Sequence, residues 1–102
     1  MKKLLILAIL ALFSAKPAYA DMQELCTILS QYAVTVAENR FAGVPINKTV
    51  EIAQTMKSAE SRAAALEVIY AAYKLPPYPA SPTRNSVIRE FGNHTYLECI
   101  GE

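Results

Sequence analysis

The sequence predicts an all-α protein, a small irregular bundle of about four helices stapled by one disulfide bond after a cleaved signal peptide. Three observations lead to this prediction. Apolar residues recur at helical spacing in four segments, and no segment keeps the two-residue alternation of a half-buried strand. Prolines or glycines follow the first and the third of these segments. The two cysteines lie near opposite ends of the chain that follows the signal peptide.

Residues 1–20 have the three parts of a secretory signal peptide: two lysines, an apolar run, and a short end that closes on Ala-Tyr-Ala. The apolar run is shorter than the roughly 20 residues needed to span a bilayer. We therefore expect cleavage between Ala20 and Asp21, which leaves residues 21–102 as a single helical domain in the periplasm. An uncleaved amphipathic or membrane segment is the alternative.

The first helix is expected over residues 22–42, because apolar residues form a wide face there. This face consists of two adjoining stripes, Leu25, Leu29, Tyr32 and Val36, and Cys26, Ala33, Ala37 and Phe41. Gly43 supplies a C-terminal cap, and Pro45 prevents the helix from continuing.

A second, short helix is expected from Ile46 or Asn47 to Lys57, with Asn47 as its N-cap. The third is expected from Ser58 or Ala59 to residue 74. It is rich in alanine, so a neighbouring helix can approach it closely.

Four prolines in the stretch LPPYPASP exclude a helix directly after the third one. Ser81 followed by Pro82 is typical of an N-cap and a first helical residue, with residues 85–86 as the alternative start of the fourth helix. The helical spacing of apolar residues continues to Cys99, although Gly92 and Asn93 are expected to weaken the middle of this helix.

The two cysteines are predicted to form one intramolecular disulfide. Four helices joined by short connections tend to alternate in direction, which brings Cys99 at the end of the last helix beside Cys26 in the first. Small secreted domains rely on such bonds. Closing a loop of about seventy residues is worth roughly 4 kcal/mol in the loop-closure treatment. A free thiol, an intermolecular bridge, and a catalytic or metal-binding cysteine are the alternatives.

Catalytic and metal-binding patterns are scarce in the sequence. The only histidine, His94, points to a different helix face from Cys99. Glu38 and Glu67 would suit acid–base catalysis only as a pair, and nothing in the sequence brings them together. Spacings typical of zinc, covalent haem or phosphate sites are absent from the sequence. We therefore expect no enzyme, no cofactor and no metal.

Removing residues 1–20 takes away three lysines and no acidic residue, so the net charge falls from +1 to −2. A weakly acidic domain offers no basic surface for nucleic acid or for anionic lipid. We therefore expect neither nucleic acid nor, after signal cleavage, a membrane as partner.

Two groups of residues are candidate binding positions. The first is a partner surface made by Tyr70, Tyr73 and Tyr78, which lead into the proline-rich turn; covering the end of the core is the alternative. The second is Glu38 with Arg40. Arg40 is expected to bond the free carbonyls at the end of its own helix, with a ligand contact as the alternative.

Two stretches, LCTILSQYAVTVAENRFAGVP and ALEVIYAAY, follow the signal peptide and precede a late cysteine. In this pattern the chain resembles small uncharacterised two-cysteine helical periplasmic proteins of Gram-negative bacteria. The resemblance implies a compartment, an all-α fold and a disulfide, but no activity. Acid-stress chaperones of the HdeA type share the size, the helices and the single disulfide of this chain, which is an analogy and not a relationship. We therefore expect a non-enzymatic protein that binds an envelope protein or a small ligand; an acid-stress holdase is the alternative, and an enzyme a more distant one.

Overall fold

The computed structural model describes residues 19–101, and they form four helices, which confirms the predicted all-α class. The helices are α2 (Tyr19–Phe41), α3 (Ile46–Ala53), α4 (Ala59–Tyr73) and α5 (Pro82–Ile100). Most of the predicted signal peptide, residues 1–18, lies outside the described residues. The predicted cleavage position, between Ala20 and Asp21, falls in the first turn of α2.

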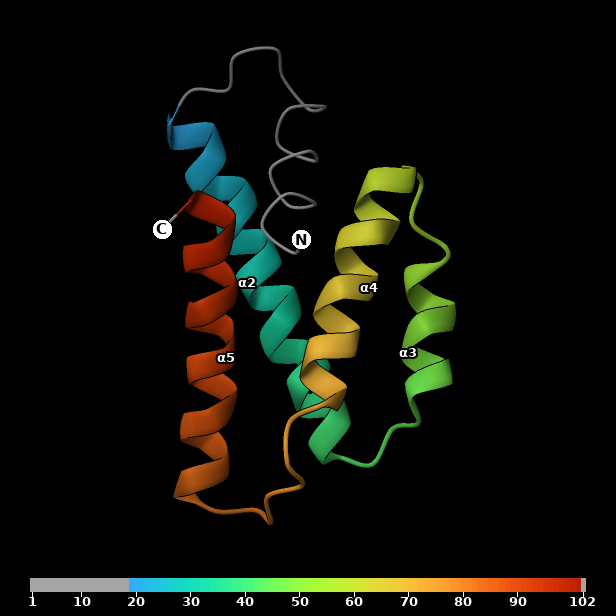
Figure 1. Ribbon diagram of the computed structural model, residues 1–102, viewed down its shortest axis with the longest axis vertical. Coiled ribbons are helices and arrows are strands. Elements are labelled where there is room, and N and C mark those ends of the chain that lie inside the picture. Colours follow the sequence, from blue (N-terminus) through green and yellow to red (C-terminus); the bar gives the residue numbers. More distant parts are fainter. Residues whose placement is uncertain (1–18, 102) are drawn as a thin grey trace.

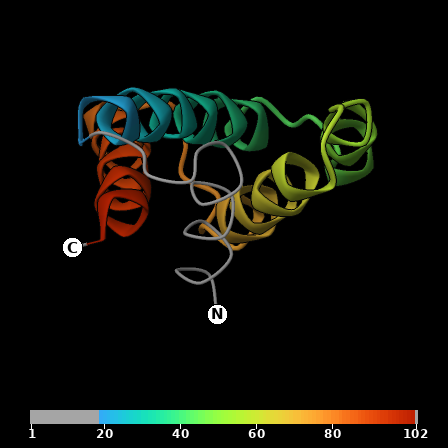
Figure 2. The same ribbon diagram turned by 90° about the horizontal axis from the view of Figure 1, so that it is seen from above.

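The helices alternate in direction along the chain, as Figure 1 shows. α2 packs against both α5 and α4, and α3 packs mainly against α4. α4 and α5 make at most weak direct contact, and Figure 2 shows them diverging from the same side of α2. The bundle is therefore open between α4 and α5.

The main core lies between α2 and α4. Its buried residues are Ala33 and Val36 of α2, Ala53 of α3, and Ala65, Val68, Ile69 and Ala72 of α4. Ile69 is fully buried and is the largest of the fully buried side chains. The alanines of α4 let α2 approach closely, as the composition of this helix predicts.

One face of α5 packs against α2, and we call this contact the α2–α5 seam. The buried residues of α5 recur every three or four positions and are Ile88, Gly92, Thr95 and Cys99. A Cβ atom at Gly92 would lie 2.6 Å from Cγ2 of Val34 on α2, so the two helices are too close there for any larger residue. The Ser30 hydroxyl donates a hydrogen bond to the Gly92 carbonyl at 2.8 Å.

Gly92 therefore differs from its expected role. The sequence suggests that it weakens the fourth helix, but α5 runs without interruption from Pro82 to Ile100. The intrinsic preference of glycine against helix, about 1 kcal/mol, is offset by the close packing that its missing side chain allows.

The predicted disulfide is present and joins Cys26 of α2 to Cys99 of α5, whose Cα atoms are 5.4 Å apart. Both cysteines are buried. Partly buried apolar residues pack around them: Met22, Leu25, Leu29, Tyr96 and Ile100. The bond therefore closes the α2–α5 seam at the end where the chain finishes.

Three of the predicted helix ends are confirmed. Gly43 follows α2 with a positive φ of 86°, a conformation that glycine adopts without strain. The Ser58 hydroxyl accepts from the Ser61 amide at 3.0 Å and caps α4. Ser81 caps α5 and Pro82 is its first residue, so the earlier of the two predicted starts is the right one.

The prediction for the second helix is confirmed at its start, Ile46, but is wrong about its N-cap and its end. Pro45, rather than Asn47, occupies the N-cap position of α3, and its side chain makes no capping bond. The helix ends at Ala53 instead of Lys57. The Thr55 hydroxyl donates to the Ile52 carbonyl at 2.6 Å, a local bond that competes with helix continuation.

Candidate functional site

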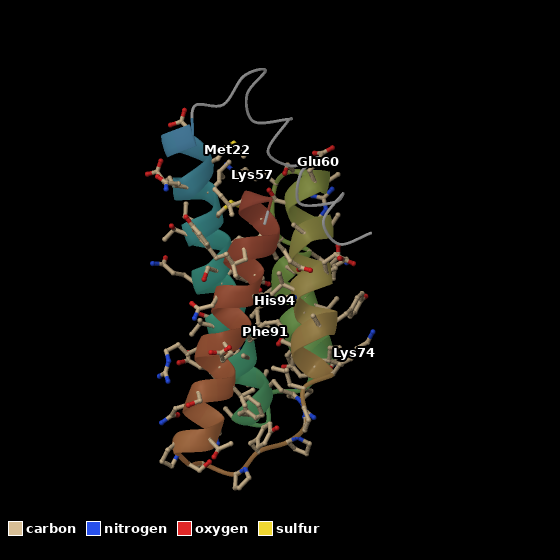
Figure 3. All side chains as sticks on the ribbon, turned by 60° about the vertical axis from the view of Figure 1, so that its left-hand side comes forward. Met22, Lys57, Glu60, Lys74, Phe91 and His94 are labelled. Carbon is tan, nitrogen blue, oxygen red and sulfur yellow. A yellow bond between two sulfur atoms is a disulfide. The ribbon has the colours of Figure 1, made fainter. Side chains whose placement is uncertain are left out.

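A groove with a volume of about 240 Å³ lies between α4 and α5. Its lining residues are Glu67, Val68, Ala71 and Lys74 of α4 and Phe91, His94, Thr95 and Glu98 of α5. In Figure 3, Phe91 and His94 follow one another along α5 on the side of α4, and Lys74 lies near the lower end of α4. The groove exists because α4 and α5 both pack on α2 but not firmly on each other.

Charge is distributed unevenly along the groove. Lys74 follows Glu67 by about two helical turns on α4, and Glu98 follows Phe91 by about two turns on α5. Because α4 and α5 run in opposite directions, the two glutamates lie towards the disulfide end of the groove. Lys74 and Phe91 lie towards the proline-rich segment. The groove therefore has an acidic end and a basic end, separated mainly by small and apolar side chains.

One carboxylate oxygen of Glu67 has unusual surroundings. Its Oε2 is buried and has no hydrogen-bond partner in the structure. A buried carboxylate oxygen that lacks a donor costs free energy, since it has lost water without replacing it. Glu67 as a whole is half-buried and lines the groove, so a donor or a cation that enters there can approach its side chain.

His94 and Glu98 form the only ion-pair contact that the structure contains within residues 19–101. The His94 Nε2 lies 3.4 Å from the Glu98 Oε2, one helical turn apart on α5. The His94 side chain is 68% exposed and that of Glu98 is 28% exposed. His94 thus lies at the mouth of the groove, and Cys99, bonded to Cys26, offers no thiol with which it could act.

Tyr32 of α2 lies close to the level of Glu67. Both residues precede the contact between Arg40 and Leu75 by eight positions, and α2 and α4 run in the same direction. The Tyr32 hydroxyl is also buried without a hydrogen-bond partner, so it does not satisfy Glu67 in this structure. Burial raises the pKa of the Tyr32 phenol above its ordinary value of 10.0.

Tyr32→Phe is expected to stabilise the fold by about 1 kcal/mol, because it removes a buried hydroxyl that has no partner. For a domain of this size, that corresponds to a melting temperature about 4–8 °C higher. The advantage of the variant should grow in alkali. In the unchanged protein, the raised pKa of Tyr32 has no effect on stability below pH 10.0, but it lowers stability as the pH rises from there towards the folded-state pKa, whereas phenylalanine does not titrate. Thermal melts at neutral pH and at about pH 11 measure both effects.

The matched control for this change is Tyr70→Phe, because the Tyr70 side chain is 49% exposed. It should leave the neutral melting temperature unchanged. A lower melting temperature for Tyr32→Phe than for the unchanged protein would mean that the hydroxyl has a partner in solution.

The three tyrosines of the predicted partner surface do not form one exposed patch. The Tyr73 hydroxyl donates to the Val44 carbonyl at 2.7 Å and is partly buried. The Tyr78 ring packs edge-on against Phe41, with the ring centroids 6.2 Å apart. Only Tyr70 is exposed. The contacts of Tyr73 and Tyr78 therefore hold the loops after α2 and after α4 against the end of the core.

Arg40 does not cap its own helix, contrary to the expectation from the sequence. Its Nη2 donates to the carbonyl of Leu75, just after α4, at 3.2 Å. Its guanidinium also lies 5.8 Å from the centroid of the Tyr73 ring. Glu38 is exposed on α2 and does not line the groove that contains Glu67. Arg40 thus joins the lower ends of α2 and α4.

Within residues 19–101, no group of three or more His, Cys, Asp or Glu side chains is arranged to hold a metal ion. In the same part of the chain, none of the helices combines the length and the apolar character needed to cross a membrane. No family model, no curated protein and no solved structure matches this sequence. The function is therefore inferred from the residues of the groove.

Proposed function

We propose that this chain is a non-enzymatic periplasmic protein that binds a small ligand in the groove between α4 and α5. The observation that carries the proposal is a groove of about 240 Å³ whose wall includes Glu67, a half-buried residue that makes no ion pair within residues 19–101. Ligand sites typically combine apolar walls with a few polar groups that fix orientation. Val68, Ala71 and Phe91 supply such walls, and Glu67 supplies such a group.

The size of the groove favours a small molecule over an envelope protein as the ligand. Its volume lies just below the roughly 300–1,000 Å³ of sites that hold drug-sized molecules. The large apolar side chains that are exposed belong to all four helices and are Ile28, Ile46, Ile52, Tyr70 and Leu97. Exposure of single apolar residues is ordinary in monomeric proteins and does not indicate a partner.

Two observations support the periplasmic part of the proposal. Residues 1–20 have the composition of a bacterial signal peptide. The buried Cys26–Cys99 disulfide is typical of proteins in oxidising compartments, where such bonds form and persist.

A fragment screen followed by NMR tests the proposal. The isotope-labelled protein, exported and oxidised, is mixed in turn with neutral, anionic and cationic small molecules. At least one class should shift the amide signals of Ala71 and His94. Ala71→Phe, which places a ring in the groove, should abolish these shifts.

Ala59→Phe is the matched control, because Ala59 is an exposed alanine of the same helix outside the groove. It should leave the response unchanged. If no fragment shifts the groove signals, or if both variants respond alike, the groove does not bind small molecules and the proposal is wrong.

Acid separates this proposal from the alternative of an acid-stress holdase. At about pH 3, below the reference pKa of most carboxylates, we expect the helix content to be retained. Acid unfolds a protein mainly by protonating carboxylates that native ion pairs keep charged. Residues 19–101 contain only one such pair, His94–Glu98. Circular dichroism, dye binding and a client-aggregation assay measure the response. Reversible dye binding together with strong protection of the client would instead favour the holdase.

A further inference from the structure

We infer that the groove selects a small aliphatic amine, whose ammonium group binds at Glu67 and Glu98 while its alkyl chain runs along the apolar walls. This inference rests on the proposed function and names the chemical class of the ligand.

The acidic end of the groove lacks a cation from the protein itself. Glu67 makes no ion pair with any side chain of residues 19–101, and its buried Oε2 has no donor. The only lysine of the lining, Lys74, lies about two helical turns from Glu67, or about 10 Å along the helix axis. An ammonium group at Glu67 would provide the missing positive charge and hydrogen-bond donors.

Glu98 adds a second carboxylate to the same end. Its Oε2 lies 3.4 Å from the His94 Nε2, and its side chain is 28% exposed. Two carboxylates against one distant lysine make the lining net negative when His94 is neutral. The charge of the acidic end is thus complementary to a cation and opposes an anion.

The apolar walls require the cation to carry a hydrocarbon chain. Val68 and Ala71 lie between Glu67 and Lys74 on α4, and Phe91 faces them from α5. An extended hexyl chain fits the length of about 10 Å between the two ends. Lys74 at the far end repels a second ammonium group, so the groove favours a monoamine over a diamine.

Titrations with matched probes test this selectivity. The oxidised full chain, after export, is titrated with hexylamine, hexanol and hexanoate, and the amide signals of Ala71 and His94 are followed by NMR. Hexylamine should bind about tenfold more tightly than hexanol, as a charge-assisted hydrogen bond contributes at least this factor. Hexanoate should bind most weakly.

Glu67→Gln keeps the size of the side chain and removes its charge, so it should lower the affinity for hexylamine about tenfold and leave that for hexanol unchanged. Glu98→Gln is a second variant, at a less buried position, and should weaken hexylamine binding in the same direction. Glu51→Gln, an exposed carboxylate of α3 outside the groove, is the control and should have no effect.

The outcomes separate this inference from the proposed function. If hexanol or hexanoate shifts the groove signals as strongly as hexylamine does, the groove binds ligands but the preference for an amine is wrong. The same conclusion follows if neither glutamine variant weakens hexylamine binding. If none of the three probes shifts the groove signals, the amine inference is overturned, and the fragment screen alone decides whether the groove binds another class.

Discussion

Replacing Cys26 and Cys99 together with alanine should lower the free energy of unfolding by roughly 4 kcal/mol. The disulfide joins residues 73 positions apart, so its loss releases nearly the whole described chain to explore open conformations when unfolded. Domains of this size have a net stability of about 5–15 kcal/mol, so the loss is a large share of the total. Urea unfolding of the oxidised protein and of the double variant measures it.

Reduction of the unchanged protein serves as an independent comparison, because it removes the same cross-link without changing a side chain. The two losses should agree within about 1 kcal/mol, since the alanines also leave small voids where the sulfur atoms pack. If both the variant and the reduced protein lose less than about 1 kcal/mol, the unfolded chain is already compact and the loop-closure account fails.

Gly92→Leu should destabilise the protein by about 3 kcal/mol, the upper part of the range for overpacking a well-packed contact. Leucine has a higher helix propensity than glycine, so the loss cannot come from α5 itself. It comes from the α2–α5 seam, where even a Cβ atom would lie 2.6 Å from Cγ2 of Val34. The larger side chain forces the two helices apart, and thermal or urea unfolding of the oxidised protein measures the cost.

Asn93→Leu is the matched control, because Asn93 is the exposed neighbour of Gly92 on the same helix. It should change the stability by no more than about 0.5 kcal/mol. A double-mutant cycle adds a second test: Val34→Ala removes the atom that a Cβ at position 92 would meet, so it should recover part of the loss caused by Gly92→Ala. Additive effects of these two changes would argue against a direct contact.

The helix ends that follow from local chemistry could be predicted from the sequence. Ser58 and Ser81 cap their helices, and Gly43 ends α2 with a positive φ, because each depends only on residues within one turn. Asn47 shows the limit of this reasoning. Pro45 already fixes the backbone at the N-cap position of α3, so the polar side chain that follows has no capping function.

The groove could not be predicted, because it depends on the angle at which α4 and α5 leave α2. Helical spacing identifies which face of each helix is apolar, but not which pair of helices stays apart. One signal was available: Glu67 is the only charged residue between Arg62 and Lys74 in an otherwise alanine-rich, apolar helix. An isolated charge in such a helix indicates a special environment, whereas the sequence suggests Glu67 only as one half of an acid–base pair with Glu38, a pair that nothing in the sequence supports.

Gly92 is a second residue that could have indicated the arrangement of the helices, but helix propensity alone led to the wrong interpretation. A glycine inside a helical segment predicts weakness if the helix is considered in isolation. It indicates close approach if a neighbouring helix contains small or branched residues at matching positions, as α2 does with Ser30 and Val34. The choice between the two interpretations needs the tertiary arrangement.

The pairing of the first described helix with the last one determines the order in which this protein can fold. α3 and α4 are neighbours in the chain and can associate early, and α2 can pack against α4, whereas the face of α2 that contains Cys26 waits for α5. Until α5 docks, the face of α2 that contains Cys26 lacks its partner, and the Cys26 thiol stays open to reaction. The docking of α5, rather than the first contacts between helices, therefore sets the moment at which the native structure closes.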